Sequence, residues 1–274
     1  MKRSLSLLCA IVLAVAAPAA AAQGFPTGDV FRPLVADPIE TRSFVSVVGL
    51  DAERAQSTFA PIGVGLDFPL YRWAGNAPRD GWQLGFFAAI QSQFDLEGDS
   101  FPLVNTDYRV GFPLTFRRGD VSGRVRLFHQ SSHLGDEFLL QGGAPARMDL
   151  SIEAIDAVLA WDRGNWRPYA GVLYMLHRDP PDLERAALQV GVDYTGTRRV
   201  LWGGRLVGGI DVRALEENDW RAGRSAKVGL AWGGRKPDGR GVTVMLQYFD
   251  GSAPFGQFYR DVLSYYGVAL EFHY

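Results

Sequence analysis

The feature that most restricts the fold of this chain is a series of runs in which apolar residues occupy every second position. In one run, Ile62 and Leu66 lie opposite Asp67 and two glycines. In the next, Trp82 and Phe86 lie opposite glutamines and small residues. Side chains of a β-strand alternate between the two faces of a sheet, so each run has one apolar and one small or polar face. The pattern predicts an all-β protein without a convincing helix.

Twelve such runs follow one another, and most have about 9 to 13 residues, the length of a tilted membrane-spanning strand. They are Arg42–Leu50, Pro61–Trp73, Trp82–Phe94, Thr106–Arg117, Val121–His133, Met148–Trp161, Trp166–His177, Arg185–Tyr194, Val200–Arg213, Ser225–Trp232, Gly241–Phe249 and Leu263–Tyr274. Short turns alternate with longer polar links, as in outer-membrane barrels, whose short turns face the periplasm. We therefore expect residues 42–274 to form a single 12-stranded antiparallel transmembrane β-barrel. A soluble barrel or sandwich would instead bury the apolar faces, and periodicity alone does not exclude it.

The first 22 residues have the composition of a secretory signal peptide. Lys2 and Arg3 precede an apolar run, Leu5–Ala16, which is too short to span a bilayer as a helix, and small residues up to Ala22 provide a cleavage site. Cleavage there would leave 252 residues without a cysteine, which excludes disulfides and thiol catalysis. Residues 23–41 hold three prolines, and we expect a loop or periplasmic extension.

The final run carries the most specific membrane signal. Aromatic and aliphatic residues occupy every second position to the last residue of the sequence: Tyr266, Val268, Leu270, Phe272 and Tyr274. This resembles the C-terminal signature of Gram-negative outer-membrane proteins, which the barrel-assembly machinery recognises. We therefore expect location in that membrane, with its lipid, lipopolysaccharide and the assembly machinery as partners. The expected mature net charge of −4, from 26 basic and 30 acidic residues, does not indicate a nucleic-acid partner.

The fifth run, Val121–His133, contains the strongest candidates for chemistry. Its apolar face, which includes Leu127, continues into His129, Ser131 and His133. In a barrel this face would contact the outer leaflet, near the extracellular end of the strand. His129 and Ser131 would lie about 6.6 Å apart along one face. An imidazole can span that distance, accept the serine proton and so activate a weak nucleophile.

This His-x-Ser pair on the outside of a twelve-stranded barrel resembles the outer-membrane phospholipase A family, and also the lipid A deacylases. The resemblance implies that His129 is the base and Ser131 the nucleophile in hydrolysis of outer-leaflet acyl chains. In the phospholipases, a polar residue about a dozen positions after the serine orients the histidine. Here that window, Leu140–Gly143, contains no Asn, Asp or Glu, and Ser132-His133 stands where the phospholipase motif continues with Asn-Gly.

The orienting role would then pass to the sixth run, with Glu153 as the first choice and Asp149 as the second. If Leu150 and Ile152 face lipid, however, Glu153 points into the lumen, and a β-bulge would be needed to bring it outward. Backbone N–H groups near Gly135 could supply an oxyanion site.

The lumen side of the runs is rich in charge. Arg124 and Arg126 lie there and could bind an inward-pointing Glu153. Further charged residues on this side are Arg109, Arg117, Arg205, Asp67, Asp193, Asp211 and Glu271. We expect either an ion-paired plug in a narrow barrel or an anion-conducting pore, since twelve strands enclose a modest lumen.

Two further interpretations of the fifth run stay open beside acyl hydrolysis. The histidines and Ser131 could be interfacial groups that bind the barrel rim and lipid headgroups. Alternatively, His129, His133, Asp136 and Glu137 could bind an anion or a divalent cation such as calcium, although their spacing fixes no ligand geometry. As a non-enzyme, the protein would be a narrow channel or a structural barrel.

A longer resemblance covers most of the expected mature chain. The segments Phe101–Phe138 and Asp250–Tyr274 are similar to a family of Gram-negative outer-membrane proteins known only as a domain of unknown function, numbered twelve hundred and seven. The resemblance implies a barrel and brings no established activity.

Overall fold

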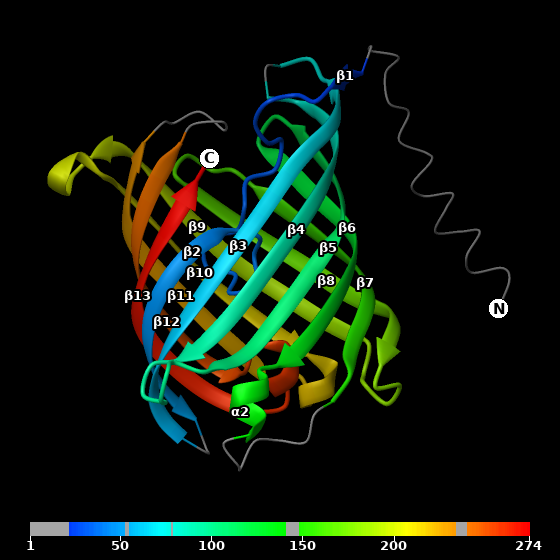
Figure 1. Ribbon diagram of the computed structural model, residues 1–274. Helices are drawn as coiled ribbons and strands as arrows, with labels where there is room; N and C mark the ends of the chain where they lie inside the picture. Colours follow the sequence, from blue (N-terminus) through cyan, green and yellow to red (C-terminus); the bar gives the residue numbers. More distant parts are fainter. Residues whose placement is uncertain (1–21, 53–54, 78, 141–147, 234–239) are drawn as a thin grey trace, which may run out of the picture.

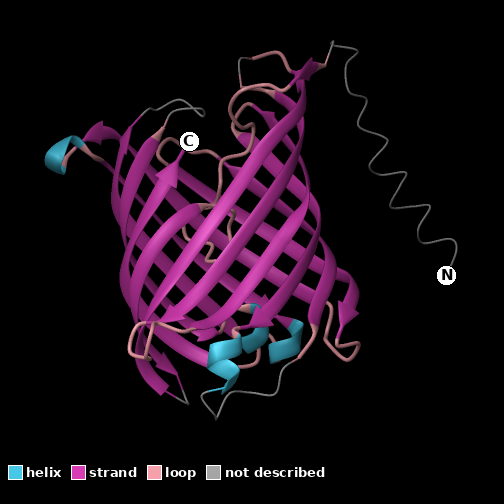
Figure 2. Cartoon of the chain, in the orientation of Figure 1, coloured by secondary structure: helices cyan, strands magenta, loops and turns pink. Residues whose placement is uncertain are grey.

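The computed structural model describes residues 22–52, 55–77, 79–140, 148–233 and 240–274, so the predicted signal peptide lies outside the described residues except at its last position. The chain forms a closed antiparallel barrel of twelve long strands (Figures 1 and 2). These strands are β2 (Ser43–Ala52), β3 (Ala55–Ala74), β4 (Gly81–Asp95), β5 (Leu103–Arg118), β6 (Val121–Leu134), β7 (Leu150–Trp161), β8 (Trp166–Asp179), β9 (Ala186–Arg199), β10 (Arg205–Leu215), β11 (Ala222–Gly233), β12 (Gly241–Ser252) and β13 (Val262–His273). Each of the twelve predicted runs corresponds to one of these strands, and the predicted fold class is confirmed.

The barrel closes through the pairing of its last and first long strands. Residues of β13 pair with β2 from Leu263↔Ala52 to Phe272↔Ser43, and every other long strand pairs with its neighbours in the sequence. A two-residue strand, β1 (Gln23–Gly24), extends the sheet beside the end of β3. Closure removes the free sheet edges that would otherwise expose unpaired backbone groups to lipid.

The apolar faces of the strands point outward. On β6, Val125 and Leu127 are 41% and 52% exposed, while Arg124 and Arg126 are 7% and 3% exposed. A soluble barrel would show the reverse, because water would cover its outer surface. An apolar exterior around a charged interior is the arrangement of a transmembrane barrel, and it decides between the two folds that periodicity left open.

The two ends of the barrel differ. The short turn after β5 and the end of β13 lie at the same end, which the rule of short turns makes the periplasmic end (Figure 1). Longer links at the other end carry the helix α2 (Asp136–Leu140) and the 3₁₀ turns η2 (Glu216–Asn218) and η3 (Gly256–Phe258). Another 3₁₀ turn, η1 (Leu201–Gly203), follows β9. Within the described ranges, no helix is long and apolar enough to span a membrane.

The segment that we expected to be a loop or periplasmic extension enters the barrel. Figure 2 shows this loop descending inside the ring of strands. Leu34, Ala36, Asp37 and Glu40 are each fully buried. A proline-containing loop can occupy a lumen when the strands satisfy its polar groups, and here the inward side chains do so. We call residues 25–42 the lumenal segment.

Ion pairs hold the lumenal segment in place. Glu40 accepts a bidentate pair of hydrogen bonds from Arg124, at 2.8 and 3.0 Å, and Asp37 accepts one from Arg213 at 3.2 Å. Arg167 donates to the carbonyl oxygens of Arg32 and Pro33, at 2.9 and 2.8 Å. Ion pairs therefore occur inside the lumen, as the sequence predicted, and two of their acids, Asp37 and Glu40, come from the lumenal segment rather than from the strands.

Candidate functional site

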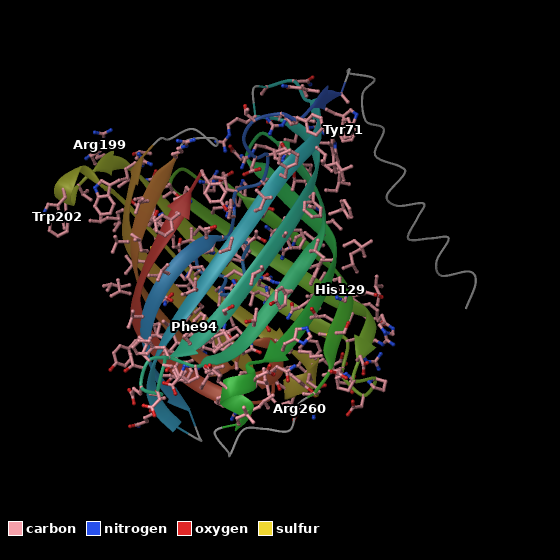
Figure 3. The ribbon with its side chains drawn as sticks, viewed as in Figure 1. Tyr71, Phe94, His129, Arg199, Trp202 and Arg260 are labelled. Carbon is pink, nitrogen blue, oxygen red and sulfur yellow. The ribbon has the colours of Figure 1, made fainter. Side chains whose placement is uncertain are left out.

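The outward face of β6 carries the predicted catalytic pair. His129 and Ser131 are partly exposed, and the inward residues Phe128 and Ser132 beside them are buried. On the preceding strand, Val110 lies in register with His129, and Tyr108 with Ser131. Figure 3 shows His129 on the outer wall, in the half of the barrel nearer the long loops. The predicted outward orientation of the pair, toward the outer leaflet, agrees with this placement.

Glu153 on β7 lies directly opposite His129 on the neighbouring strand β6. The register of β6 with β7 pairs His129 with Glu153 and Ser131 with Ser151. Directly opposed residues of an antiparallel pair share one face, with Cβ atoms about 4.5–5.5 Å apart. The imidazole, the serine hydroxyl and the carboxylate therefore lie together on the outer wall.

The expectation that Glu153 points into the lumen is wrong. It assumed that Leu150 and Ile152 face lipid, but these side chains are 8% and 7% exposed and pack inside the barrel against Leu183 and Tyr259. Because side chains alternate, Glu153 must then face outward, and no bulge between β6 and β7 is needed. The lumen beside the outer end of β7 is apolar. The alternation of residues along β7 alone could not reveal this.

A third polar residue, which the sequence reasoning missed, extends this row. His177 on β8 is in register with Glu153, beyond a shift in the ladder between Glu153 and Ala154. The row His129, Glu153 and His177 thus crosses three strands on the outer wall. A register shift cannot be read from alternation, and this is why sequence reasoning did not bring His177 to the site. Asp149, the second choice for the orienting acid, precedes β7 and lies outside this ladder.

The side chains of this row are neighbours on the outer wall, but His129 is not hydrogen-bonded to the other proposed catalytic residues. Among the hydrogen bonds of the described residues, none links His129 to Ser131 or to Glu153. His133 is exposed and packs edge-on against the Tyr108 ring, with a centroid distance of 6.0 Å. The aromatic contact gives His133 a packing role at the rim.

The other predicted groups are not assembled. In the part of the chain that the structure describes, no three His, Cys, Asp or Glu side chains form a group able to hold a metal ion. His129, His133, Asp136 and Glu137 are therefore not brought together as a calcium site; the last two belong to α2.

The oxyanion site expected near Gly135 stays a prediction, and the N–H of Gly135 itself takes no part in it. The Gly135 N–H donates to the carbonyl oxygen of Val104 at 3.0 Å, so it is not free to bind an anion. Of the window Leu140–Gly143, only Leu140 lies within the described residues.

Arg124 and Arg126, proposed from sequence as binding residues, lie on the opposite side of the wall. Arg124 binds Glu40, as described above. Arg126 donates to Asp156, with Nε and Nη2 at 3.0 and 2.6 Å from one carboxylate oxygen. Their partners are acids inside the lumen rather than Glu153, so these arginines hold the barrel interior together.

The family of the chain is shown by comparison. Residues 5–274 match the family described as Protein of unknown function (DUF1207). The chain belongs to this family. Membership confirms the resemblance seen in Phe101–Phe138 and Asp250–Tyr274. No curated protein sequence matches the chain.

Solved outer-membrane barrels resemble the fold. Outer membrane phospholipase A from Escherichia coli is 17% identical, with a TM-score of 0.59, over 89% of this chain and 99% of that chain. The Salmonella typhi outer membrane phospholipase, solved as a dimer with bound calcium, is 17% identical with a TM-score of 0.58, over 89% of this chain and 93% of that chain. At this identity the likeness shows the fold alone: a barrel of the outer-membrane type.

Proposed function

We propose that this outer-membrane barrel is an acyl hydrolase that acts on ester-linked acyl chains of outer-leaflet lipid. Ser131 is the nucleophile, His129 the general base and Glu153 the acid that orients the imidazole. The observation that carries the proposal is the register of β6 and β7, which places Glu153 opposite His129 on the face that bears Ser131. A nucleophile, a base and an orienting group in this order form the general arrangement for activating a serine.

The chemistry follows from these positions. His129 accepts the Ser131 proton while Oγ attacks the ester carbonyl, and it then gives that proton to the departing alcohol. A water molecule, deprotonated by His129, hydrolyses the acyl-serine, releasing a fatty acid and restoring the serine. Glu153 stabilises the imidazolium that forms in each half of the reaction. Hydrogen bonds between catalytic residues are often long without substrate and shorten when substrate binds. This agrees with the absence of hydrogen bonds from His129 to Ser131 and Glu153 in the structure without substrate.

The surroundings of the pair suit a lipid substrate. Val110 on β5 and Leu127 on β6 are 40% and 52% exposed on the same outer wall. Acyl chains of the outer leaflet would contact these side chains, and the ester groups at the membrane interface would reach the level of Ser131 near the strand end. A substrate delivered by the membrane needs no pocket in the protein.

The lumen gives less support to the alternative of a narrow channel. Four residues of the lumenal segment are fully buried inside the barrel, and Arg124 and Arg213 bind two of its acids. A structural barrel without activity is the remaining alternative. It would account for every feature of the fold, but it gives no reason for the alignment of His129, Ser131 and Glu153 on the outer wall.

The test compares two serines that face each other across the strands. Purified wild-type protein, Ser131→Ala and Ser151→Ala would be reconstituted in vesicles of phospholipid and of lipopolysaccharide, and released fatty acid would be measured. We expect hydrolysis by the wild type, loss to background in Ser131→Ala, and retention in Ser151→Ala, because Ser151 is in register with Ser131 rather than beside the base.

Two outcomes would overturn the proposal. Background release by the wild type from both lipids would leave the structural barrel as the function. Equal activity of Ser131→Ala and the wild type would exclude Ser131 as the nucleophile. Heat-dependent mobility on gels would establish that each variant forms the barrel.

A further inference from the structure

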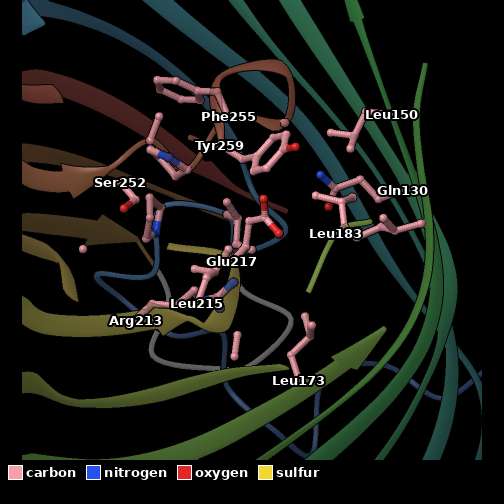
Figure 4. Close-up of a pocket in the computed structure, with 18 of the residues that line it drawn as sticks. Gln130, Leu150, Leu173, Leu183, Arg213, Leu215, Glu217, Ser252, Phe255 and Tyr259 are labelled. Carbon is pink, nitrogen blue, oxygen red and sulfur yellow. The ribbon is translucent and has the colours of Figure 1, made fainter. Parts of the chain in front are cut away.

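A mainly apolar cavity lies inside the outer half of the barrel, on the other side of the wall from the proposed catalytic set (Figure 4). Its volume is about 120 Å³. The walls carry Leu150 and Ile152 from β7 and Leu173 and Met175 from β8. No step of the proposed hydrolysis uses this cavity, so it is a candidate for a second site.

The cavity has a floor and a roof built from different parts of the chain. Pro38 and Ile39 of the lumenal segment form the floor. The link between β12 and β13 folds into the mouth of the barrel and forms the roof, where Phe255 and Tyr259 lie over the cavity (Figure 4).

Hydrogen bonds fasten this roof to four neighbouring parts of the chain. Gln257 donates to the carbonyl oxygens of Ser132 and Met148, at 2.7 and 2.8 Å. The Gly256 N–H donates to Asp107 at 2.9 Å, and Asn218 of η2 donates to the Tyr259 carbonyl oxygen at 2.9 Å. The roof is therefore a fixed part of the cavity wall, and the space is preformed.

The charged groups at the edge of the cavity already have partners. Asp211 accepts hydrogen bonds from the Tyr169 hydroxyl and the Gln189 amide, both at 2.7 Å. Arg213 binds Asp37, as described above, and Glu217 accepts a hydrogen bond from Arg260 at 2.8 Å. A charged ligand would lose its hydration in this cavity without gaining a free counter-charge, which is costly.

Apart from Gln130 and Ser252, the other side chains that line the cavity are aliphatic or aromatic. An apolar cavity of about 150 Å³ elsewhere stays free of water and takes up benzene or xenon. A space of about 120 Å³ with the same kind of lining has room for a comparable apolar group. The chemistry of the site thus selects for apolar surface and against charge.

We propose that this cavity is a binding site for the alkyl chain of an uncharged single-chain amphiphile. Its alkyl chain packs between the β7–β8 wall and the roof. This site is separate from the proposed hydrolase site, and neither requires the other.

The test uses a photoreactive diazirine derivative of hexanol, with the protein in phosphatidylcholine nanodiscs and adducts located by mass spectrometry. We expect labelling of inward residues, such as Leu173 and Tyr259, that saturates and that unlabelled hexanol competes away. Hexanoate, which carries a charge, should compete poorly. Outward residues on the same strand, such as Tyr174, should be labelled from the bilayer without saturation.

Filling the cavity gives the decisive comparison. Leu173→Trp places a larger side chain into the cavity and should abolish the labelling of Tyr259. Leu176→Trp, the same change at an outward position of β8, should leave that labelling intact. If Leu173→Trp fails to form the barrel, Ala187→Phe would fill the same space from β9.

Three results would overturn the inference. The first is the absence of saturable inward adducts in the wild type. The second is unchanged Tyr259 labelling in a folded cavity-filling variant. The third is competition by hexanoate as strong as that by hexanol, which would show that the cavity does not select against charge.

Discussion

A single substitution of Glu153 can test whether its carboxylate orients the His129 imidazole. The side chains in register with His129 are Val110 and Glu153, so Glu153 supplies the acidic group opposite the imidazole. We expect Glu153→Ala to lower kcat by about 10²-fold or more, with little change in KM, because an unoriented base transfers protons poorly. Glu153→Gln keeps a hydrogen-bond acceptor and should retain more activity than Glu153→Ala.

The matched control is an acid at the same rim outside the ladder. Asp149→Asn should leave kcat within the error of the wild type, measured on the same vesicles. If Glu153→Ala and Asp149→Asn behave alike, the carboxylate opposite His129 has no special role. Equal losses in kcat for Glu153→Gln and Glu153→Ala would contradict orientation by hydrogen bonding.

A second residue-level prediction concerns Glu40. Its carboxylate is fully buried between Arg124 and Arg126, and its loss would leave buried charge without a partner. We expect Glu40→Ala to lower the free energy of unfolding by about 3–5 kcal/mol, since breaking a buried pair costs this much. Urea unfolding in vesicles, followed by tryptophan fluorescence, would measure it.

An exposed ion pair provides the comparison for Glu40. Arg224 and Asp250 lie 3.4 Å apart, with side chains 66% and 42% exposed. Asp250→Ala should change the free energy of unfolding by less than about 1 kcal/mol, because water screens such pairs. Equal effects of the two substitutions would show that the lumenal segment contributes no specific pairing.

At the scale of elements, the turn between β7 and β8 ties the lumenal segment to the periplasmic end. Arg32 pairs there with Asp162, and Arg117 lies 2.7 Å from the same carboxylate. Burial raises the pKa of Asp162, but Arg32 and Arg117 outweigh it and hold that pKa below its usual value of 3.8. A lowered pKa in the folded state gives stability that is present above the unfolded value and is lost as the pH falls through the folded value.

Acidification should therefore loosen the lumenal segment near this turn. We expect amide exchange around Arg32, corrected for intrinsic rates, to quicken as the pH falls below 3.8. Asp162→Asn should exchange quickly already at pH values where the wild type is protected. An unchanged exchange rate in Asp162→Asn would show that the turn does not hold the segment.

The strands themselves were predictable, because alternation and turn residues are local signals. All twelve runs and the outward face of β6 followed from them. The face of β7 was not predictable, because alternation shows which residues share a side and not which side faces lipid. Leu150 and Ile152 are apolar but line a lumenal cavity, and this reversed the assignment of Glu153.

The lumenal segment was also beyond the sequence signals. Its prolines indicate a loop, but the partners that draw it inward, such as Arg124 and Arg213, are far away in the sequence. Ion pairs between residues far apart in the sequence produce no periodic pattern in that sequence. The charged lumenal faces of the strands could be predicted from the sequence, but the contribution of Asp37 and Glu40 to neutralising them could not.

At the scale of the whole molecule, the filled lumen predicts a barrel that does not conduct ions. The plug depends on two acids of the lumenal segment, Asp37 and Glu40, which neutralise Arg213 and Arg124. We expect the wild type to show no steady conductance in planar bilayers. The double variant Asp37→Ala/Glu40→Ala removes two negative charges from the lumen and loosens the segment, so it should open a channel.

That channel should prefer anions, because the arginines of the wall would then lack partners and attract negative ions. Reversal potentials in a salt gradient would measure the preference. The control is Asp182→Ala/Asp250→Ala, which removes two exposed acids at the outer end and should stay closed. Steady conductance by the wild type would show that the lumenal segment does not seal the barrel, and would favour the channel function over the hydrolase. A cation-selective double variant would show that the lumenal arginines do not control the field in the pore.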